Sequence, residues 1–150
     1  MEKPIKTRRG LPTESKNEAD NYYFACSATL RIFGDIANMD EISATLGLKP
    51  AHTHRKGEKR GNRAVEYRQD MWSYGPPLDK SEPLHRHIDA LWLKLKPHKH
   101  YLLELKKSVR VDVFLGYQSN CDTAGIEVPH TSLEMFSELE IPFGVSIIVF

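Results

Sequence analysis

The chain has 150 residues, a formal net charge of +1, and apolar and charged fractions of 40% and 27%. This length suits one domain with a real core, and these fractions are ordinary for a soluble globular protein, with no overall charge that demands an anionic partner. The purely apolar runs are far too short to span a membrane, and two cysteines are too few for a disulfide scaffold, so we expect a reducing, cytoplasmic setting.

The N-terminal segment, residues 1–19, is polar and has no hydrophobic period. We expect it to be a disordered tail, and residues 20–150 to form a single domain. Basic residues in this tail precede no apolar stretch, which excludes a secretory signal. They could contact nucleic acid, but we expect a solvated tail instead.

Residues 22–33 alternate apolar side chains with polar or small ones, which predicts a half-buried strand. Arg31 lies on its less apolar face. Asn38 stands three residues before Glu41, a spacing typical of a helix N-terminus, and Gly47 is placed to end the short helix that follows.

The next segment, residues 52–63, has two glycines and no apolar period, so we predict a loop. Four of its cations are candidates for contact with an acidic protein surface or a nucleic acid backbone: Arg55, Lys56, Lys59 and Arg60. An ordinary solvated loop explains the same charges. His52 and His54 could chelate a metal ion, but no carboxylate or cysteine stands at a familiar ligand spacing, and we predict no metal site.

Residues 64–67 and 71–74 follow as two short predicted strands that could form a hairpin. Their aromatic side chains are Tyr67, Trp72 and Tyr74. Such rings can stack on bases. We expect them instead to pack against the helices, as strand aromatics usually do.

The clearest helix begins after Ser81, and its apolar stripe is Leu84, Ile88, Leu91, Trp92 and Leu95. Pro97 stops or kinks it, and a shorter helix follows around Leu102. Residues 109–115 predict a second long strand, with Arg110 and Asp112 on its less apolar face. A short strand at 125–128, a helix and a final strand at 143–150 complete the chain.

The predicted fold is therefore α+β, in the order β-α-β-β-α-α-β-β-α-β. The helices each have one stripe to bury, which predicts a two-layer sandwich of a mostly antiparallel sheet with helices on one face. Arg31, Arg110 and Asp112 would then stand on the open face of the sheet together with aromatic residues. That face is a candidate binding surface. Alternatively, it is an ordinary solvent-exposed face that includes a few hydrophobic residues.

Several segments carry a family pattern: LRIFGD, LGLKPAHTHRKGE, MWSYG, HIDALWLKLKPHKHYLLEL and VDVFLGYQS. Together they resemble the bacterial domain-of-unknown-function family 4279 from about residue 22 to residue 150. The most specific parts are LGLKP followed by KGE, and the WS pair. The resemblance implies a small intracellular α+β domain and implies no reaction, cofactor or catalytic residue.

No catalytic signature is present in the sequence, so we predict no catalytic residue and no cofactor. Cys121 and His130 could form a nucleophile and base, but Cys121 has no nucleophile elbow, and the adjacent acid disfavours a reactive thiolate. We expect a non-enzymatic protein-interaction module, for example an immunity-type protein that neutralises a toxin. Two alternatives stay open: a small-ligand-binding or enzymatic domain that uses the open sheet face, and a nucleic-acid binder that uses the 52–63 loop.

Overall fold

The computed structural model describes residues 22–121 and 125–150, so the expected N-terminal tail lies outside the described residues. Its elements follow in this order: β1 (Phe24–Gly34), α1 (Met39–Leu46), β2 (His52–His54), β3 (Asp70–Tyr74), α2 (Leu84–Leu95), η2 (Lys96–His98), α3 (Lys99–Leu105), β4 (Arg110–Ser119), η3 (His130–Leu133), α4 (Glu134–Leu139) and β5 (Phe143–Val149). Within the described part of the chain, no helix is long and apolar enough to cross a membrane.

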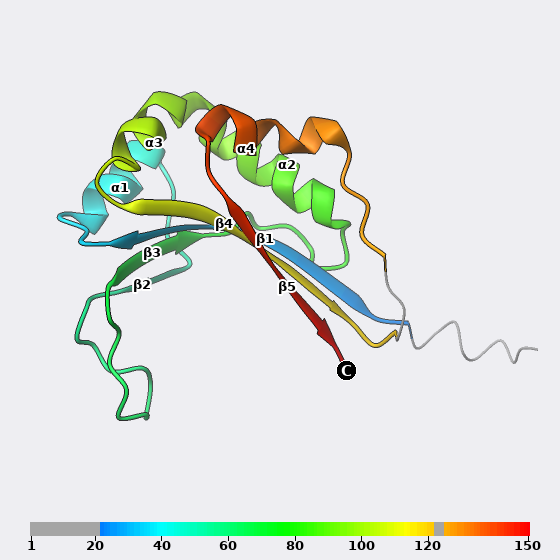
Figure 1. Cartoon of the computed structure of the whole chain (residues 1–150), viewed down its shortest axis with the longest axis horizontal. Coiled ribbons are helices and arrows are strands. Elements are labelled where there is room, and N and C mark those ends of the chain that lie inside the picture. The colour runs from blue at the N-terminus through cyan, green and yellow to red at the C-terminus, as the bar shows by residue number, and fades with distance from the viewer. Residues whose placement is uncertain (1–21, 122–124) are drawn as a thin grey trace, which may run out of the picture.

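The five strands form one sheet in the order β2-β3-β1-β4-β5. All neighbouring strands are antiparallel except β4 and β5, which run parallel. Figure 1 shows the α-helices together on one side of this sheet. The predicted α+β class, with a mostly antiparallel sheet and helices on one face, is confirmed.

The core lies between the helices and the sheet. On β1 and β4 the paired residues Leu30 and Val113 are completely buried, and Ile88 and Leu91 of α2 are equally buried in the helix layer above. Each such side chain stabilises the fold by about 1.5–3 kcal/mol relative to an exposed one. The period-two face of the strands and the helical stripe therefore meet as the sequence predicts.

The predicted ends of α1 are also confirmed. The Asn38 side chain accepts a hydrogen bond from the Glu41 backbone N–H at 3.1 Å, and Gly47 ends the helix in the left-handed conformation with φ of 64°. Because a side chain would be strained there, glycine suits this position.

Two of the predicted short strands are wrong. Residues 64–67 form only an isolated bridge, between Lys59 and Glu66, and residues 125–128 form no strand. The strand that pairs with β3 is instead β2, in which His54 is paired with Met71. The start of the predicted 52–63 loop is therefore a strand. A run of only four residues shows too little alternation of apolar and polar side chains to predict which segment forms the edge strand of the sheet.

Candidate functional site

The helix-free face of the sheet carries a row of polar side chains that crosses four strands. Asp112 of β4 is paired with Arg31 of β1, Arg31 with Ser73 of β3, and Ser73 with His52 of β2. Directly paired residues direct their side chains to the same face of a sheet. The β-sheet register therefore brings together residues that are far apart in the sequence.

The three residues predicted for the open face lie together. Nε and Nη2 of Arg31 donate to the two carboxylate oxygens of Asp112, each at 2.8 Å, and Nη2 of Arg110 lies 3.5 Å from Asp112 Oδ2. The Asp112 side chain is only 3% exposed, whereas the side chains of Arg31 and Arg110 are 30% and 64% exposed. A carboxylate this buried requires such pairing, so Asp112 positions the two arginines, and the arginines face the solvent.

Aromatic rings hold these guanidinium groups against the sheet. The Arg31 guanidinium lies 4.7 Å from the ring centre of Phe114 and 5.5 Å from that of Phe33, and the Arg110 guanidinium lies 5.2 Å from Phe33. Cations over ring faces are attracted by the ring quadrupole. The charged groups on this face are thus fixed in position by both the carboxylate and the rings.

The segment that joins β2 to β3 projects away from the β2–β3 edge of the sheet (Figure 1). Its Tyr67 ring stacks on His54, with ring centres 3.4 Å apart and an angle of 8° between the planes. The guanidinium of Arg60 lies 5.4 Å from the centre of the same ring. Tyr67 therefore does not pack against the helices as predicted, whereas Trp72 and Tyr74 are buried in the core.

A hollow of about 550 Å³ lies between this segment and the sheet. Its lining includes Arg31, Phe33, His52, His54, Arg60, Val65, Tyr67, Arg68 and Met71. Arg31 from the sheet and Arg60 from the predicted basic loop thus share one concave site. The sequence pattern predicts these as two separate surfaces, gives no signal for Arg68, and places Tyr67 against the helices rather than in this lining.

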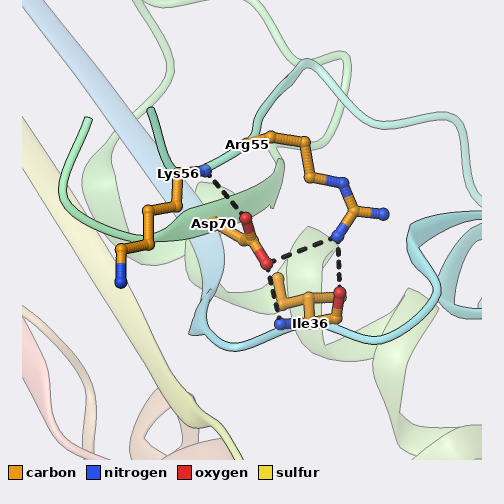
Figure 2. Close-up of polar contacts among 4 residues, drawn as sticks. All are labelled: Ile36, Arg55, Lys56 and Asp70. Atoms are coloured by element: carbon orange, nitrogen blue, oxygen red, sulfur yellow. Dashed lines mark hydrogen bonds and ion pairs between the residues drawn. The ribbon is translucent and has the colours of Figure 1, made fainter. Parts of the chain in front are cut away.

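The remaining cations of the basic loop have other positions. Asp70 accepts hydrogen bonds from the backbone N–H of Lys56 at 2.8 Å and of Ile36 at 3.0 Å, and Nη1 of Arg55 lies 3.3 Å from its Oδ2 (Figure 2). Arg55 also donates to the Ile36 carbonyl at 2.5 Å. Arg55 therefore fastens the loop to the end of β1, and the side chain of Lys59 is exposed beyond the lining of the hollow.

This arrangement lowers the pKa of Asp70. The Lys56 N–H has the largest effect, the Ile36 N–H and the Arg55 guanidinium add to it, and burial acts in the opposite direction. A carboxylate that accepts several N–H bonds is stabilised in its charged form. Asp70 is thus the anchor that fixes both ends of the segment carrying Arg60 and Tyr67.

The two histidines of β2 lie beside the hollow, and Nε2 of His52 is 2.9 Å from Nδ1 of His54. Burial, followed by the charge of His52, lowers the pKa of His54. The lowered pKa favours the neutral form of His54, and Arg31, Arg60 and Arg68 give the hollow permanent positive charge. The described residues contain no group of three or more histidine, cysteine or carboxylate side chains placed to hold a metal ion.

Cys121 and His130, the conceivable nucleophile and base, are not brought into hydrogen-bond contact in the described structure. The Cys121 thiol lies 3.9 Å from the side-chain oxygen of Asn120, and His130 is exposed at the start of η3. This geometry provides no activated nucleophile of the kind that a thiol paired with a base would form.

Comparisons with known proteins identify a family for the chain and assign no chemistry to it. No curated protein and no solved structure matches the chain. The model of one family, described as a domain of unknown function, DUF4279, matches residues 23–150. This match covers β1 to β5 and nearly the whole chain, as the LGLKP, KGE and WS segments suggested. The chain therefore belongs to the DUF4279 family.

Proposed function

We propose that this protein is a non-enzymatic binding module that recognises an acidic segment of a partner protein on the helix-free face of its sheet. The observation that carries the proposal is the meeting of Arg31 and Arg60 at one hollow. An immunity-type protein that binds an acidic surface of a toxin is one form of this proposal.

The charges of the hollow support an anionic ligand. Arg31, Arg60 and Arg68 line it, and Glu66 is the one carboxylate among the described lining residues. The nearby Asp112 is already paired with two arginines. Guanidinium groups bind carboxylates in a bidentate manner, which gives both strength and direction. A carboxylate of the partner would therefore find cations with free donors here.

The apolar part of the lining supports a peptide rather than a simple anion. Phe33, Val65, Tyr67 and Met71 share the hollow with the arginines. Protein interfaces are enriched in aromatic residues, methionine and arginine at their centres. The combination suits an acidic segment that also carries an apolar side chain.

A nucleic acid fits this surface less well. Nucleic-acid-binding domains carry an extended basic stripe and a strongly positive charge, and this chain has a net charge of +1. Three of its eight described ion pairs also engage arginines of this end of the molecule: Arg31, Arg55 and Arg110. The hollow therefore presents a confined group of cations, of which Arg60 and Arg68 take part in no described ion pair, rather than an extended basic stripe.

The proposal can be tested with a photo-crosslinking amino acid at Val65, which is exposed and lines the hollow. The full chain is expressed in its native host, irradiated and analysed by mass spectrometry, with the crosslinker at Leu93 of α2 as the control for exposed apolar positions. We expect a discrete protein adduct at Val65 that is absent at Leu93 and maps to an acidic segment.

A pair of charge variants sharpens the test. Arg60→Glu should reduce the adduct at least tenfold, whereas Arg86→Glu, the same change on an exposed arginine of α2, should leave it unchanged. An adduct with nucleic acid, an adduct with a small metabolite only, or equal loss in both variants would overturn the proposal.

A further inference from the structure

β5 is an edge strand with an unusual amount of exposed apolar surface. It pairs only with β4 among the described strands. Its five large apolar side chains are between 46% and 62% exposed: Phe143, Val145, Ile147, Ile148 and Val149. A contiguous apolar stretch of this kind on a folded protein marks an interaction surface.

The strand also lacks the features that keep sheet edges from pairing with other strands. Phe143–Val149 contains no charged residue and no proline. Edge strands of monomeric proteins are usually short, charged or interrupted. The opposite edge of this sheet follows that rule, since β2 has three residues, two of which are histidines. The two edges are therefore built differently.

The parallel pairing determines which backbone groups of β5 face outward. The Pro142 carbonyl accepts from the Val113 N–H, and the Phe150 N–H donates to the Ser119 carbonyl. Even-numbered residues of this strand therefore turn their backbone groups toward β4. Successive residues of a strand direct these groups to opposite sides, so Val145 and Ile147 direct theirs outward, where a further strand can bind.

We propose that β5 pairs in antiparallel fashion with β5 of a second copy of this chain, about a two-fold axis that passes beside Ser146. This register uses all seven residues of the strand. On the helix side it places Phe143 opposite Val149 of the partner subunit, and Val145 opposite Ile147 of the partner subunit. On the open side it places Gly144 opposite the partner's Ile148.

The composition of β5 favours a second copy over another occupant. A two-fold axis places a strand against itself, so any charged residue near the axis would face the same charge. β5 has none. Its large residues also fall opposite small ones on the open face, where Ile148 meets glycine. The strand thus brings no like charges together across the axis, and Ile148 falls opposite the small Gly144 of the partner subunit.

The faces of the two subunits agree in this register. The residues Phe143, Val145 and Ile147 are paired with the core positions Val113, Leu115 and Tyr117 of β4, so their side chains point to the helix side. Residues that are directly opposite share a face, so both helix layers would lie on the same side of one continuous sheet. The exposed apolar stripe of each β5 would then be continued by that of its partner.

The first test measures the mass of the full chain by sedimentation at micromolar concentrations. We expect a dimer, twice the 17.2 kDa of the chain. Ile147→Lys should give a monomer, because the change is on a 62% exposed side chain and places two lysines near the axis. Leu93→Lys is the matched control, since Leu93 is 76% exposed on α2, and it should remain dimeric.

The second test determines the register. Ser146 and its symmetry mate would form a non-hydrogen-bonded pair, in which the Cα atoms are about 4.5 Å apart, and this separation permits a disulfide. In a Cys121→Ser background, Ser146→Cys should form a covalent dimer on mild oxidation, whereas Gln118→Cys on the exposed face of β4 should not. A monomeric or polydisperse wild-type chain, a dimer that survives Ile147→Lys, or equal crosslinking at Gln118 would each overturn the proposal.

Discussion

The rings of Tyr67 and His54 lie face to face, 3.4 Å apart, and this stack fastens the projecting segment to the edge strand β2. Tyr67 belongs to no strand, and its backbone N–H and carbonyl bond to Glu58 and Gly57 on the other arm of the segment. The stack therefore helps to position Arg60, whose guanidinium lies 5.4 Å from the centre of the Tyr67 ring.

Replacing Tyr67 should loosen the hollow without unfolding the domain. Tyr67→Ala removes the ring on which both His54 and Arg60 rest, so we expect binding of the crosslinked partner to fall about tenfold and Arg60 to become more mobile. Tyr67→Phe keeps the ring and should retain binding. Titration of the purified partner by calorimetry compares the variants, and equal affinities for wild type and Tyr67→Ala would contradict the role of the stack.

Removing the Asp70 carboxylate should destabilise the fold. Asp70→Ala leaves the N–H groups of Lys56 and Ile36 and the guanidinium of Arg55 without their acceptor. We expect the free energy of unfolding to fall by about 2–4 kcal/mol. Urea unfolding measures the effect, with Asp89→Ala on the exposed side of α2 as control. If both variants unfold at the same urea concentration, Asp70 is not an anchor.

Asp112 should matter for stability more than its exposed partner Arg110 does. Asp112→Ala leaves Arg31 partly buried without a counter-charge, which we expect to cost about 2–4 kcal/mol of unfolding free energy. Arg110→Ala removes an exposed partner at 3.5 Å and should cost less than about 1 kcal/mol. A double-mutant cycle with Arg31→Ala isolates the Arg31–Asp112 coupling. A cost for Arg110→Ala equal to that for Asp112→Ala would reverse this assignment.

Stability should decrease between pH 7.5 and pH 5. Burial lowers the pKa of His87, and burial and the charge of His52 lower that of His54. Both groups therefore take up a proton less readily in the folded state than in the unfolded state, where the pKa is about 6.5. Their stabilising effect is complete above that value and is lost as the pH falls toward the folded-state pKa.

Urea midpoints across this range measure the loss. We expect His87→Gln to flatten the pH dependence relative to wild type, with His85→Gln, a less buried histidine of the same helix, as control. The lowered pKa of Asp70 acts in a separate window, since stability from that carboxylate is lost only below about pH 4. A midpoint that does not change between pH 7.5 and pH 5 would contradict the histidine prediction.

The sequence allowed the layers of the fold to be predicted, because each long element carries its period clearly. The core faces of β1 and β4 and the stripe of α2 are as expected. The grouping of Arg31, Arg110 and Asp112 also follows, since alternation alone places all three on one face. These inferences needed only the local pattern.

The hollow could not be predicted in the same way, because it depends on how a segment without periodicity folds back. His52 and His54 alternate with Thr53, a weak signal of a strand, and nothing in the spacing shows that Tyr67 returns to stack on them. The sequence around Asp70 likewise does not predict that its carboxylate accepts hydrogen bonds from the backbone N–H groups of Ile36 and Lys56. Long-range hydrogen bonds decide the position of Arg60, and they appear only in three dimensions.

The parallel attachment of β5 has a consequence for how the molecule opens. Among the described strands, β5 pairs with β4 alone, whereas β1 to β4 form an antiparallel unit that contains Arg31 and Asp112. A weakly covered terminal strand can detach at a lower free energy than the rest of a domain. In the monomeric Ile147→Lys variant, amide exchange should therefore proceed through a partly open form in which β5 has detached while the surface that carries Arg31 and Arg110 stays assembled.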